Sequence, residues 1–311
     1  MAGFDLFIGI DWSGAQGECH KGIQVAEAEK GRACPKLIAP PQQKGWSRHD
    51  LITYLKDHQA SGRRVLAGFD FAFSHPFDDE GAYYPGYDAG AGLELDDAYS
   101  LWQMIEEVNQ HHDYYYGGGI WQHDVLRRYY NAPKRKDGSG GRGDLFQSRR
   151  RETEKTAAAQ TRSPSPTFNC VGPAGVGTGS LAGMRVLHAL KDDAVIWPIN
   201  LVSPQRPDKG VLALVEIFPA YYFAMAGVKD REKSSEPLLA LNKALAHFDA
   251  DPADQIASHV PDHDDLDALI SAAALRHLHD PEDIFVLDEA VRPAARREGW
   301  IFGVTSPKTT S

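Results

Sequence analysis

The sequence predicts an α/β protein, in which helices pack on a mixed β-sheet, for two reasons. Short apolar runs rich in β-forming residues are bounded by charged or turn residues, as expected of buried strands. Between and after these runs, apolar residues recur at the three- and four-residue spacing of helices. The clearest strands are residues 4–10, 64–70 and 210–217, and the clearest helices are residues 47–59, 180–190, 238–248 and 264–277. We interpret residues 1–311 as a single domain.

The first predicted strand, residues 4–10 (FDLFIGI), ends at Asp11 and then enters a Ser-Gly turn. Residues 22–28 and 35–38 are shorter candidate strands that can form a meander with it. Three strands, a helix and a fourth strand at residues 64–70 therefore predict a mixed sheet with helices packed on it.

The next helix carries its own start signal. Ser47 is suited to cap the helix, and Asp50 places an acidic side chain in its first turn. Leu51, Ile52 and Leu55 share one face, which we expect to pack on the sheet.

The pattern loosens after the fourth strand, where Pro and Gly residues interrupt it. We interpret residues 74–179 as an insertion containing one helix at about residues 95–111. A basic segment at about residues 127–166, rich in Gly, Ser, Arg and Lys, is expected to be mobile. Regular structure then returns, and short strands are predicted at residues 195–197 and 299–304.

The composition is that of an ordinary soluble protein, with 42% hydrophobic and 24% charged residues among 311. No apolar run approaches the roughly 20 residues of a membrane helix, and the first residues lack the basic region of a signal peptide. Three cysteines, at positions 19, 34 and 170, are far apart and are expected to be reduced thiols. We therefore expect a cytoplasmic protein without a membrane partner.

Charge is distributed unevenly along the chain, whose net charge is −10. The segment from Arg127 to Arg162 has 11 Lys and Arg against 4 Asp and Glu, which leaves 22 basic and 39 acidic residues elsewhere. Such a segment either contacts the phosphates of a nucleic acid or is a solvated loop. Aromatic residues at 114–116, 121, 129 and 130 either stack on bases or, as we favour, pack locally.

Acidic residues stand where apolar elements stop or begin. Asp11 and Asp70 end apolar strands, and Glu216 lies within one. A carboxylate in such a place is costly unless a basic group or a cation compensates it. Asp264 and Asp267 are three residues apart and project from one face of a helix. One such residue is commonly a cap or a structural acceptor, whereas several together predict a cation site.

The donor types indicate which cation this would be. Oxygen ligands without clustered Cys or paired His suit Mg²⁺ or Mn²⁺ better than zinc. Two such ions, roughly 3.5–4 Å apart, can stabilise both the attacking and the leaving oxygen of a phosphodiester displacement. His263, beside the acidic pair, is a candidate for orienting water or a leaving group, as are His75 and His259.

Six stretches carry a family resemblance. They are GIDWSG (9–14), AGFDFAF (67–73), GVGTGSLAGMRVLHAL (175–190), VEIFPA (215–220), DDLDALISA (264–272) and EGWIFG (298–303). In this order they resemble an uncharacterised family of predicted nucleases with a ribonuclease H-like fold (domain of unknown function four-twenty-nine). The resemblance spans nearly the whole chain and is weakest in the basic insertion.

The resemblance implies a metal-dependent nuclease with a mixed five-stranded sheet flanked by helices and the long insertion after the fourth strand. Active carboxylates would lie on the first and fourth strands and on a late helix. Asp11 would bridge the metal ions, Asp70 and Asp267 would be further ligands, and Asp264 would be a competing or additional one. Glu216 matches the family's glutamate before Phe-Pro, in a less direct role.

Two other functions stay open. GIDWSG also resembles the first phosphate loop of actin-like and sugar-kinase-like phosphotransferases that bind ATP, and residues 175–179 can serve as a second loop. Such proteins usually repeat the fold twice, and one copy is visible here. The other alternative is a non-catalytic binding protein with a degenerate site.

Overall fold

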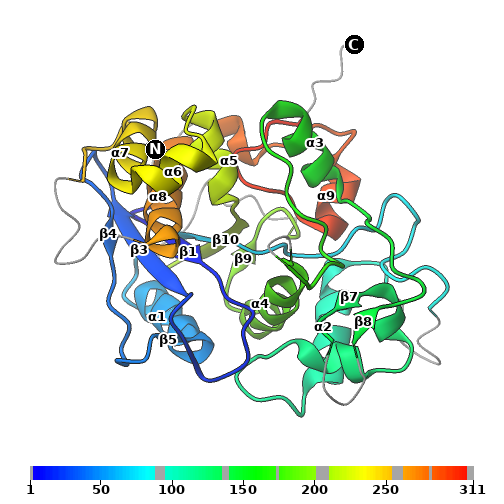
Figure 1. Cartoon of the computed structure of the whole chain (residues 1–311). Coiled ribbons are helices and arrows are strands. Elements are labelled where there is room, and N and C mark those ends of the chain that lie inside the picture. The colour runs from blue at the N-terminus through cyan, green and yellow to red at the C-terminus, as the bar shows by residue number, and fades with distance from the viewer. Residues whose placement is uncertain are drawn as a thin grey trace.

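A six-stranded mixed β-sheet with helices on both faces forms the centre of the protein (Figure 1). The structure, a computed structural model, describes residues 3–87, 95–134, 140–172, 175–200, 210–253, 262–279 and 282–306. The α/β class predicted from the sequence is confirmed. The sheet has six strands where five were expected, because two residues at its edge pair with the neighbouring strand.

Strand directions bring several strand ends to one edge of this sheet. The order is β4 (Lys36–Leu37), β3 (Gln24–Glu29), β1 (Leu6–Asp11), β6 (Val65–Phe69), β10 (Leu212–Glu216) and β9 (Val195–Ile196). β3 is antiparallel to both of its neighbours, and the other pairs are parallel. The carboxyl ends of β1, β6 and β10 therefore lie side by side.

The described helices are α1 (Arg48–Ala60), α2 (Ala98–Asn109), α3 (Glu152–Gln160), α4 (Gly177–Leu190), α5 (Pro219–Met225), α6 (Asp230–Ser235), α7 (Pro237–His247), α8 (His263–Leu278) and α9 (Arg292–Glu298). Short 3-10 turns lie at Gly118–Gln122, Leu126–Tyr129 and Glu282–Phe285. Two small ladders pair β2 (Cys19–His20) with β5 (Trp46–Ser47), and β7 (Asn131–Ala132) with β8 (Gly141–Arg142).

Most long elements match the sequence prediction, including α1, whose cap Ser47 accepts a hydrogen bond from the amide of Asp50. The expected strand at residues 299–304 is reduced to one bridge between Ile301 and Glu216. Helices α3, α5, α6 and α9 were not expected, since each has nine residues or fewer and a weak periodic pattern.

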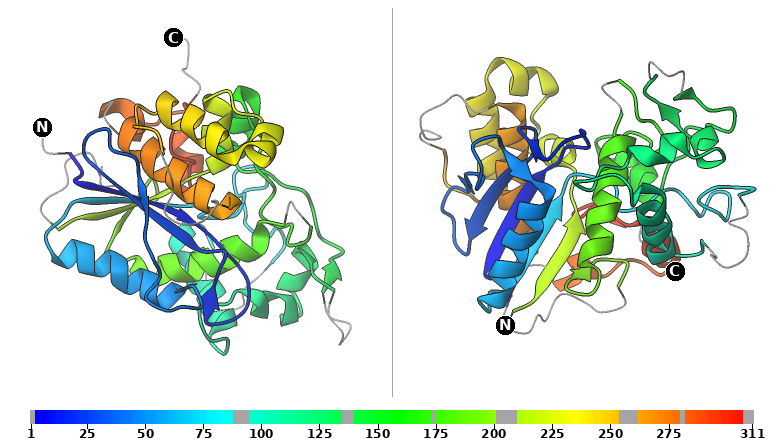
Figure 2. Two further views of the ribbon diagram at one scale, coloured as in Figure 1. Left: turned by 60° about the vertical axis from the view of Figure 1, so that its left-hand side comes forward. Right: turned by 90° about the horizontal axis from the view of Figure 1, so that it is seen from below.

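Two hydrophobic cores cover the two faces of the sheet. Helices α1 and α4 lie on one face and α8 on the other (Figure 2), and α2 packs on α4 while α5 and α7 pack on α8. Along β1 the buried residues alternate: Ile8 and Ile10 belong to the first core and Phe7 to the second. This two-residue period also decides toward which face each strand-ending carboxylate projects.

Two paired glycines let α8 lie directly on the sheet. Gly9 of β1 is the register partner of Gly68 of β6. A Cβ atom at Gly9 would lie 2.3 Å from the carbonyl oxygen of Ala268, and one at Gly68 would lie 3.0 Å from Cδ1 of Leu275, both in α8. The absence of side chains here brings Asp267, next to Ala268, over the end of β1. None of the described helices is long and apolar enough to cross a membrane.

Candidate metal centre

Asp11 and Asp70 are neighbours at the carboxyl edge of the sheet. The parallel register pairs Ile10 with Phe69, so the next residue of each strand is an aspartate. The amide of Asp70 donates to the carbonyl of Ile10 at 3.0 Å, which continues the pairing. The Cβ positions of Gly9 and Gly68 face α8. Since side chains two residues apart in a strand share a face, Asp11 and Asp70 also lie on the face covered by α8. Asp11 is 8% exposed.

Helix α8 adds the other two carboxylates. Asp262 caps the helix by accepting hydrogen bonds from the amides of Asp264 and Asp265, which fixes where the first turn begins. Asp267 is only 19% exposed in its side chain. A Cβ atom at Gly22 would lie 3.4 Å from Oδ2 of Asp264, so that carboxylate reaches the turn before β3.

The structure thus brings Asp11, Asp70, Asp264 and Asp267 together, and they repel one another. Burial raises the pKa of Asp11, and the charges of Asp70 and Asp267 raise it further. The pKa of Asp70 is raised by burial and then by Asp267. Burial also raises the pKa of Asp264 and of Asp267. Each carboxylate therefore lies where its charged form is disfavoured.

Lys233 of α6 opposes this excess of negative charge, and sequence analysis missed it. Its Nζ contacts both carboxylate oxygens of Asp267, at 2.6 and 2.7 Å. Its charge lowers the pKa of all four aspartates mentioned above. The ammonium also lies 5.0 Å from the ring centroid of Phe223, and the side chain is 14% exposed. Nothing in the charged stretch KDREKSS distinguishes this lysine from its neighbours.

The carboxylates supply the chemistry that Mg²⁺ or Mn²⁺ prefers, although the arrangement is not yet that of a ligand set. Among the described residues, no three His, Cys, Asp or Glu side chains form a group arranged to hold a metal ion. Lys233 gives a physical reason, because it engages both oxygens of Asp267. The residues fit a divalent cation in donor type and charge, with the ammonium as a stand-in cation.

Glu216 is in a different environment from these aspartates. Leu212 and Leu214 of β10 belong to the core under α1 and α4, and the two-residue period places Glu216 on that same face. Arg151 holds both of its oxygens, through Nη1 at 2.7 Å and Nη2 at 2.5 Å. The amide of Phe73 donates to it at 3.0 Å. These contacts explain why Glu216 can be buried, and its direct catalytic role stays a prediction.

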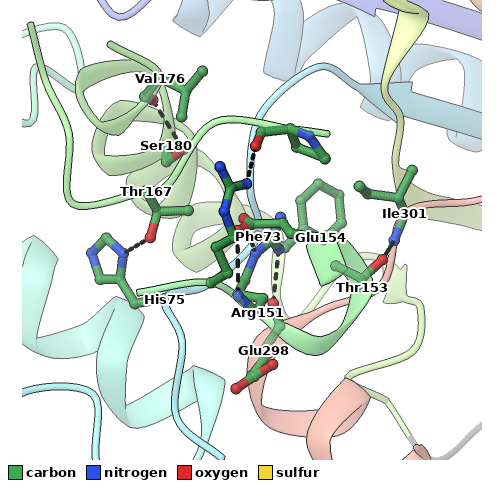
Figure 3. Close-up of polar contacts among 12 residues, drawn as sticks. Phe73, His75, Arg151, Thr153, Glu154, Thr167, Val176, Ser180, Glu298 and Ile301 are labelled. Carbon is green, nitrogen blue, oxygen red and sulfur yellow. Dashed lines mark hydrogen bonds and ion pairs between the residues drawn. The ribbon is translucent and has the colours of Figure 1, made fainter. Parts of the chain in front are cut away.

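Arg151 is a second residue that the sequence did not single out. It is 1% exposed, although it lies in the segment expected to be mobile. Its Nε donates to Glu154 Oε1 at 2.8 Å, and its Nη1 donates to the carbonyl of Glu298 at 2.9 Å (Figure 3). We call Arg151, Glu154 and Glu216 the arginine cluster, and Asp11, Asp70, Asp264, Asp267 and Lys233 the aspartate cluster.

The candidate histidines differ in position. His263 is the exposed first residue of α8, next to Asp264. His75 is fully buried, with Nδ1 2.8 Å from the hydroxyl of Thr167 (Figure 3). Its Nε2 lies 2.8 Å from the hydroxyl of Tyr130. His259 lies outside the described residues.

A cleft of about 560 Å³ opens between the two clusters, since Asp70 of the aspartate cluster and Arg151, Glu154 and Glu216 of the arginine cluster all line it. Its lining includes Trp12, Asp70, Arg162, Ser163, Thr178 and Gly179. The Ser-Gly turn after β1 and the glycine-rich residues 175–179 meet at this cleft. A Cβ atom at Gly14 would lie 2.4 Å from the amide nitrogen of Gly179. The indole of Trp12 donates to the carbonyl of Gly179 at 2.9 Å. The loop after β1 and the start of α4 therefore form one wall.

In the described part of the basic segment, two arginines are buried and form ion pairs within the protein. Arg149 is buried and pairs with Asp79, as Arg151 pairs with its glutamates. Arg162 is 43% exposed in its side chain and pairs with Asp230 at 2.8 Å. Residues 135–139 lie outside the described residues. Of the aromatic residues in this region, Tyr116, Trp121, Tyr129 and Tyr130 are buried and Tyr114 is 48% exposed, which agrees with local packing.

No family model, curated protein or solved structure matches this chain. The resemblance to the predicted nucleases therefore stays a prediction, and the functional argument depends on the site itself.

Proposed function

We propose that the chain is a divalent-metal-dependent nuclease of the ribonuclease H-like type, which hydrolyses phosphodiester bonds in nucleic acid. The observation that carries the proposal is the aspartate cluster, in which four carboxylates converge and one lysine opposes them. In the arginine cluster one arginine donates to both of its glutamates, whereas four carboxylates around one lysine leave an excess of negative charge, which is what binding of a divalent cation requires.

The positions of the carboxylates support the ribonuclease H-like fold as part of this proposal. Asp11 ends the first strand, Asp70 follows β6, the fourth of the predicted strands, and Asp267 lies on a late helix. This is the distribution that the family resemblance implies.

Asp11, Asp70 and Asp267 would hold the cation, and Asp264 would be a competing or additional ligand. When bound, a divalent cation supplies charge stabilisation for an in-line displacement at phosphorus. The burial of Asp11 limits access of water to the cluster, and Asp70 is the aspartate that reaches the cleft. Arg162, in the same cleft, is placed to contact a phosphate, and exposed His263, next to Asp264, is the candidate for orienting water or a leaving group.

The test is cleavage of single-stranded, duplex and hybrid nucleic acids with Mn²⁺ by the wild type and Asp11→Asn. We expect this variant to lose more than about 100-fold in rate, because removal of a ligand exceeds the effect of removing its supporting contacts. Asp192→Asn, at a site 87% exposed, is the matched control and should retain full activity. Equal cleavage by wild type and Asp11→Asn, or no cleavage of any substrate, would contradict the proposal.

A second candidate function, an ATP-binding phosphotransferase, is favoured by one observation: Gly14 contacts the first turn of α4 at the wall of the cleft. Backbone amides at a helix start can bind phosphates. Thermal stabilisation by ATP and Mg²⁺, without cleavage of nucleic acid, would favour this candidate over the nuclease.

A third candidate, a non-catalytic protein with a degenerate site, is favoured by the ion pair between Lys233 and Asp267. Calorimetric titration with Mn²⁺ separates it from the nuclease. A degenerate site is expected to bind no Mn²⁺.

A further inference from the structure

Helix α6 carries one side chain into the aspartate cluster and is otherwise at the surface. None of the residues of Asp230–Ser235 is buried. Yet the side chain of Lys233 is only 14% exposed, and its ammonium contacts both oxygens of Asp267. A long, flexible side chain has lost much of its freedom to reach this place, which requires a compensating attraction.

That attraction comes from the whole cluster. The positive charge of Lys233 favours the ionised form of Asp11, Asp70, Asp264 and Asp267 alike. An ammonium donates three hydrogen bonds and accepts none, so it uses the same carboxylate lone pairs that a metal ion would use. Two cations that need the same oxygens and repel each other cannot share them.

We infer that Lys233 is the internal counter-cation of the aspartate cluster, and that a divalent cation binds by displacing Lys233 from Asp267. This inference rests on the proposed function, because it presupposes the metal site. It explains why the carboxylates converge without forming a ready ligand set among the described residues.

Displacement requires little rearrangement of the protein. Beyond Lys233, two exposed ion pairs hold α6: Asp230 with Arg162 at 2.8 Å and Glu232 with Lys243 at 3.5 Å. Exposed pairs of this kind contribute roughly 0–1 kcal/mol each. The side chain of Lys233 can therefore leave without unfolding any buried contact of α6.

The experiment is calorimetric titration of the chelator-treated full chain with Mn²⁺ alone, comparing wild type with Lys233→Met. The variant keeps the length of the side chain and removes its charge. We expect it to bind Mn²⁺ at least about tenfold more tightly, because the ion no longer has to displace the ammonium of Lys233 from Asp267. Lys233→Arg keeps the competing charge and should bind no more tightly than wild type.

Lys56→Met is the matched control, since it removes the same charge from a side chain on α1 that is 41% exposed. Its affinity for Mn²⁺ should stay within about twofold of wild type, because exposed charges are screened by salt. Thermal unfolding in chelator gives a second readout. Lys233→Met should unfold a few degrees below wild type, and saturating Mn²⁺ should reverse that order.

Each outcome decides the inference. Equal Mn²⁺ affinity in wild type and Lys233→Met, or weaker binding in the variant, overturns it while leaving the proposed metal site in place. Binding by Lys233→Met alone supports it in its strongest form. Binding by none of the proteins overturns both the inference and the proposed function. If Lys233→Met does not fold, Lys233→Gln takes its place in the same comparison.

Discussion

The aspartate cluster and the arginine cluster lie at the same edge of the sheet, on opposite faces, and they treat buried charge differently. In the arginine cluster, Arg151 donates to both glutamates, and Glu216 accepts a further hydrogen bond from the amide of Phe73. Burial raises the pKa of Glu154, and Arg151 opposes that shift. In the aspartate cluster, four carboxylates have one lysine among the described residues, and burial together with their mutual repulsion raises their pKa values.

The difference separates a structural use of charge from a functional one. A buried ion pair with its hydrogen bonds complete can fix how a segment docks, and the arginine cluster ties α3 to β10 in this way. A cluster with surplus charge of one sign lowers stability, and such costs are typical of sites that bind a ligand. We therefore assign structure to the first cluster and cation binding to the second.

The largest expected effect comes from removing the one base of the arginine cluster. Arg151→Met should lower the free energy of unfolding by about 3–5 kcal/mol, because it leaves two buried carboxylates without a counter-charge. Urea denaturation of the chelator-treated protein measures it. Lys155→Met is the control on the same helix, since its pair with Glu152 is exposed and its loss should cost less than about 0.5 kcal/mol. A loss below 1 kcal/mol for Arg151→Met would remove the structural role of the arginine cluster.

A sharper comparison neutralises one carboxylate in each cluster. Glu216→Gln should destabilise the chelator-treated protein at neutral pH by about 1–3 kcal/mol, because Arg151 loses a charged acceptor. Asp70→Asn should stabilise it, because burial and the charge of Asp267 disfavour the ionised form of Asp70 and the amide carries no charge. The two variants change the same chemical group, so each is the control of the other. Effects of the same sign would mean that the two clusters do not differ in charge balance.

The sequence predicted the four aspartates of the aspartate cluster but neither Arg151 nor Lys233, for a physical reason. Asp11 and Asp70 stand at the ends of apolar runs, and Asp264 and Asp267 are spaced by three in a helix, so local patterns were enough to find them. Arg151 meets Glu216 across 65 positions and Lys233 meets Asp267 across 34, and no local pattern encodes such a meeting.

The sequence also could not predict on which face of the sheet a strand-ending carboxylate lies. Glu216 occurs in an apolar strand like the aspartates, but register and the two-residue period of β10 decide that it faces away from α8. Pattern gave the sheet and its main helices. Arg151 immediately precedes α3 and Lys233 lies in α6, and such short helices have too few turns for their periodicity to be recognised.

The smallest expected effect concerns His75, a buried ionisable group that has hydrogen-bond partners and, among the described residues, no acidic side chain paired with it. Burial lowers the pKa of His75, and the charges of Arg151 and Arg149 lower it further. The unfolded chain takes up a proton near pH 6.5 and the native protein does not, so this group reduces stability as pH falls below about 6.5. The slope is at most about 1.4 kcal/mol per pH unit for one proton.

His75→Gln keeps polar atoms beside Thr167 and Tyr130 and removes the titration. Urea unfolding between pH 7 and pH 5 should therefore show a flatter loss of stability in His75→Gln than in wild type. His111→Gln, at an exposed position, is the control and should follow the wild-type curve. Titrations of the aspartates are common to all three proteins and cancel in the comparison. If the free energy of unfolding falls with pH equally in wild type and in His75→Gln, then His75 takes up its proton in the native protein. Burial and the charges of Arg151 and Arg149 would then not keep His75 neutral.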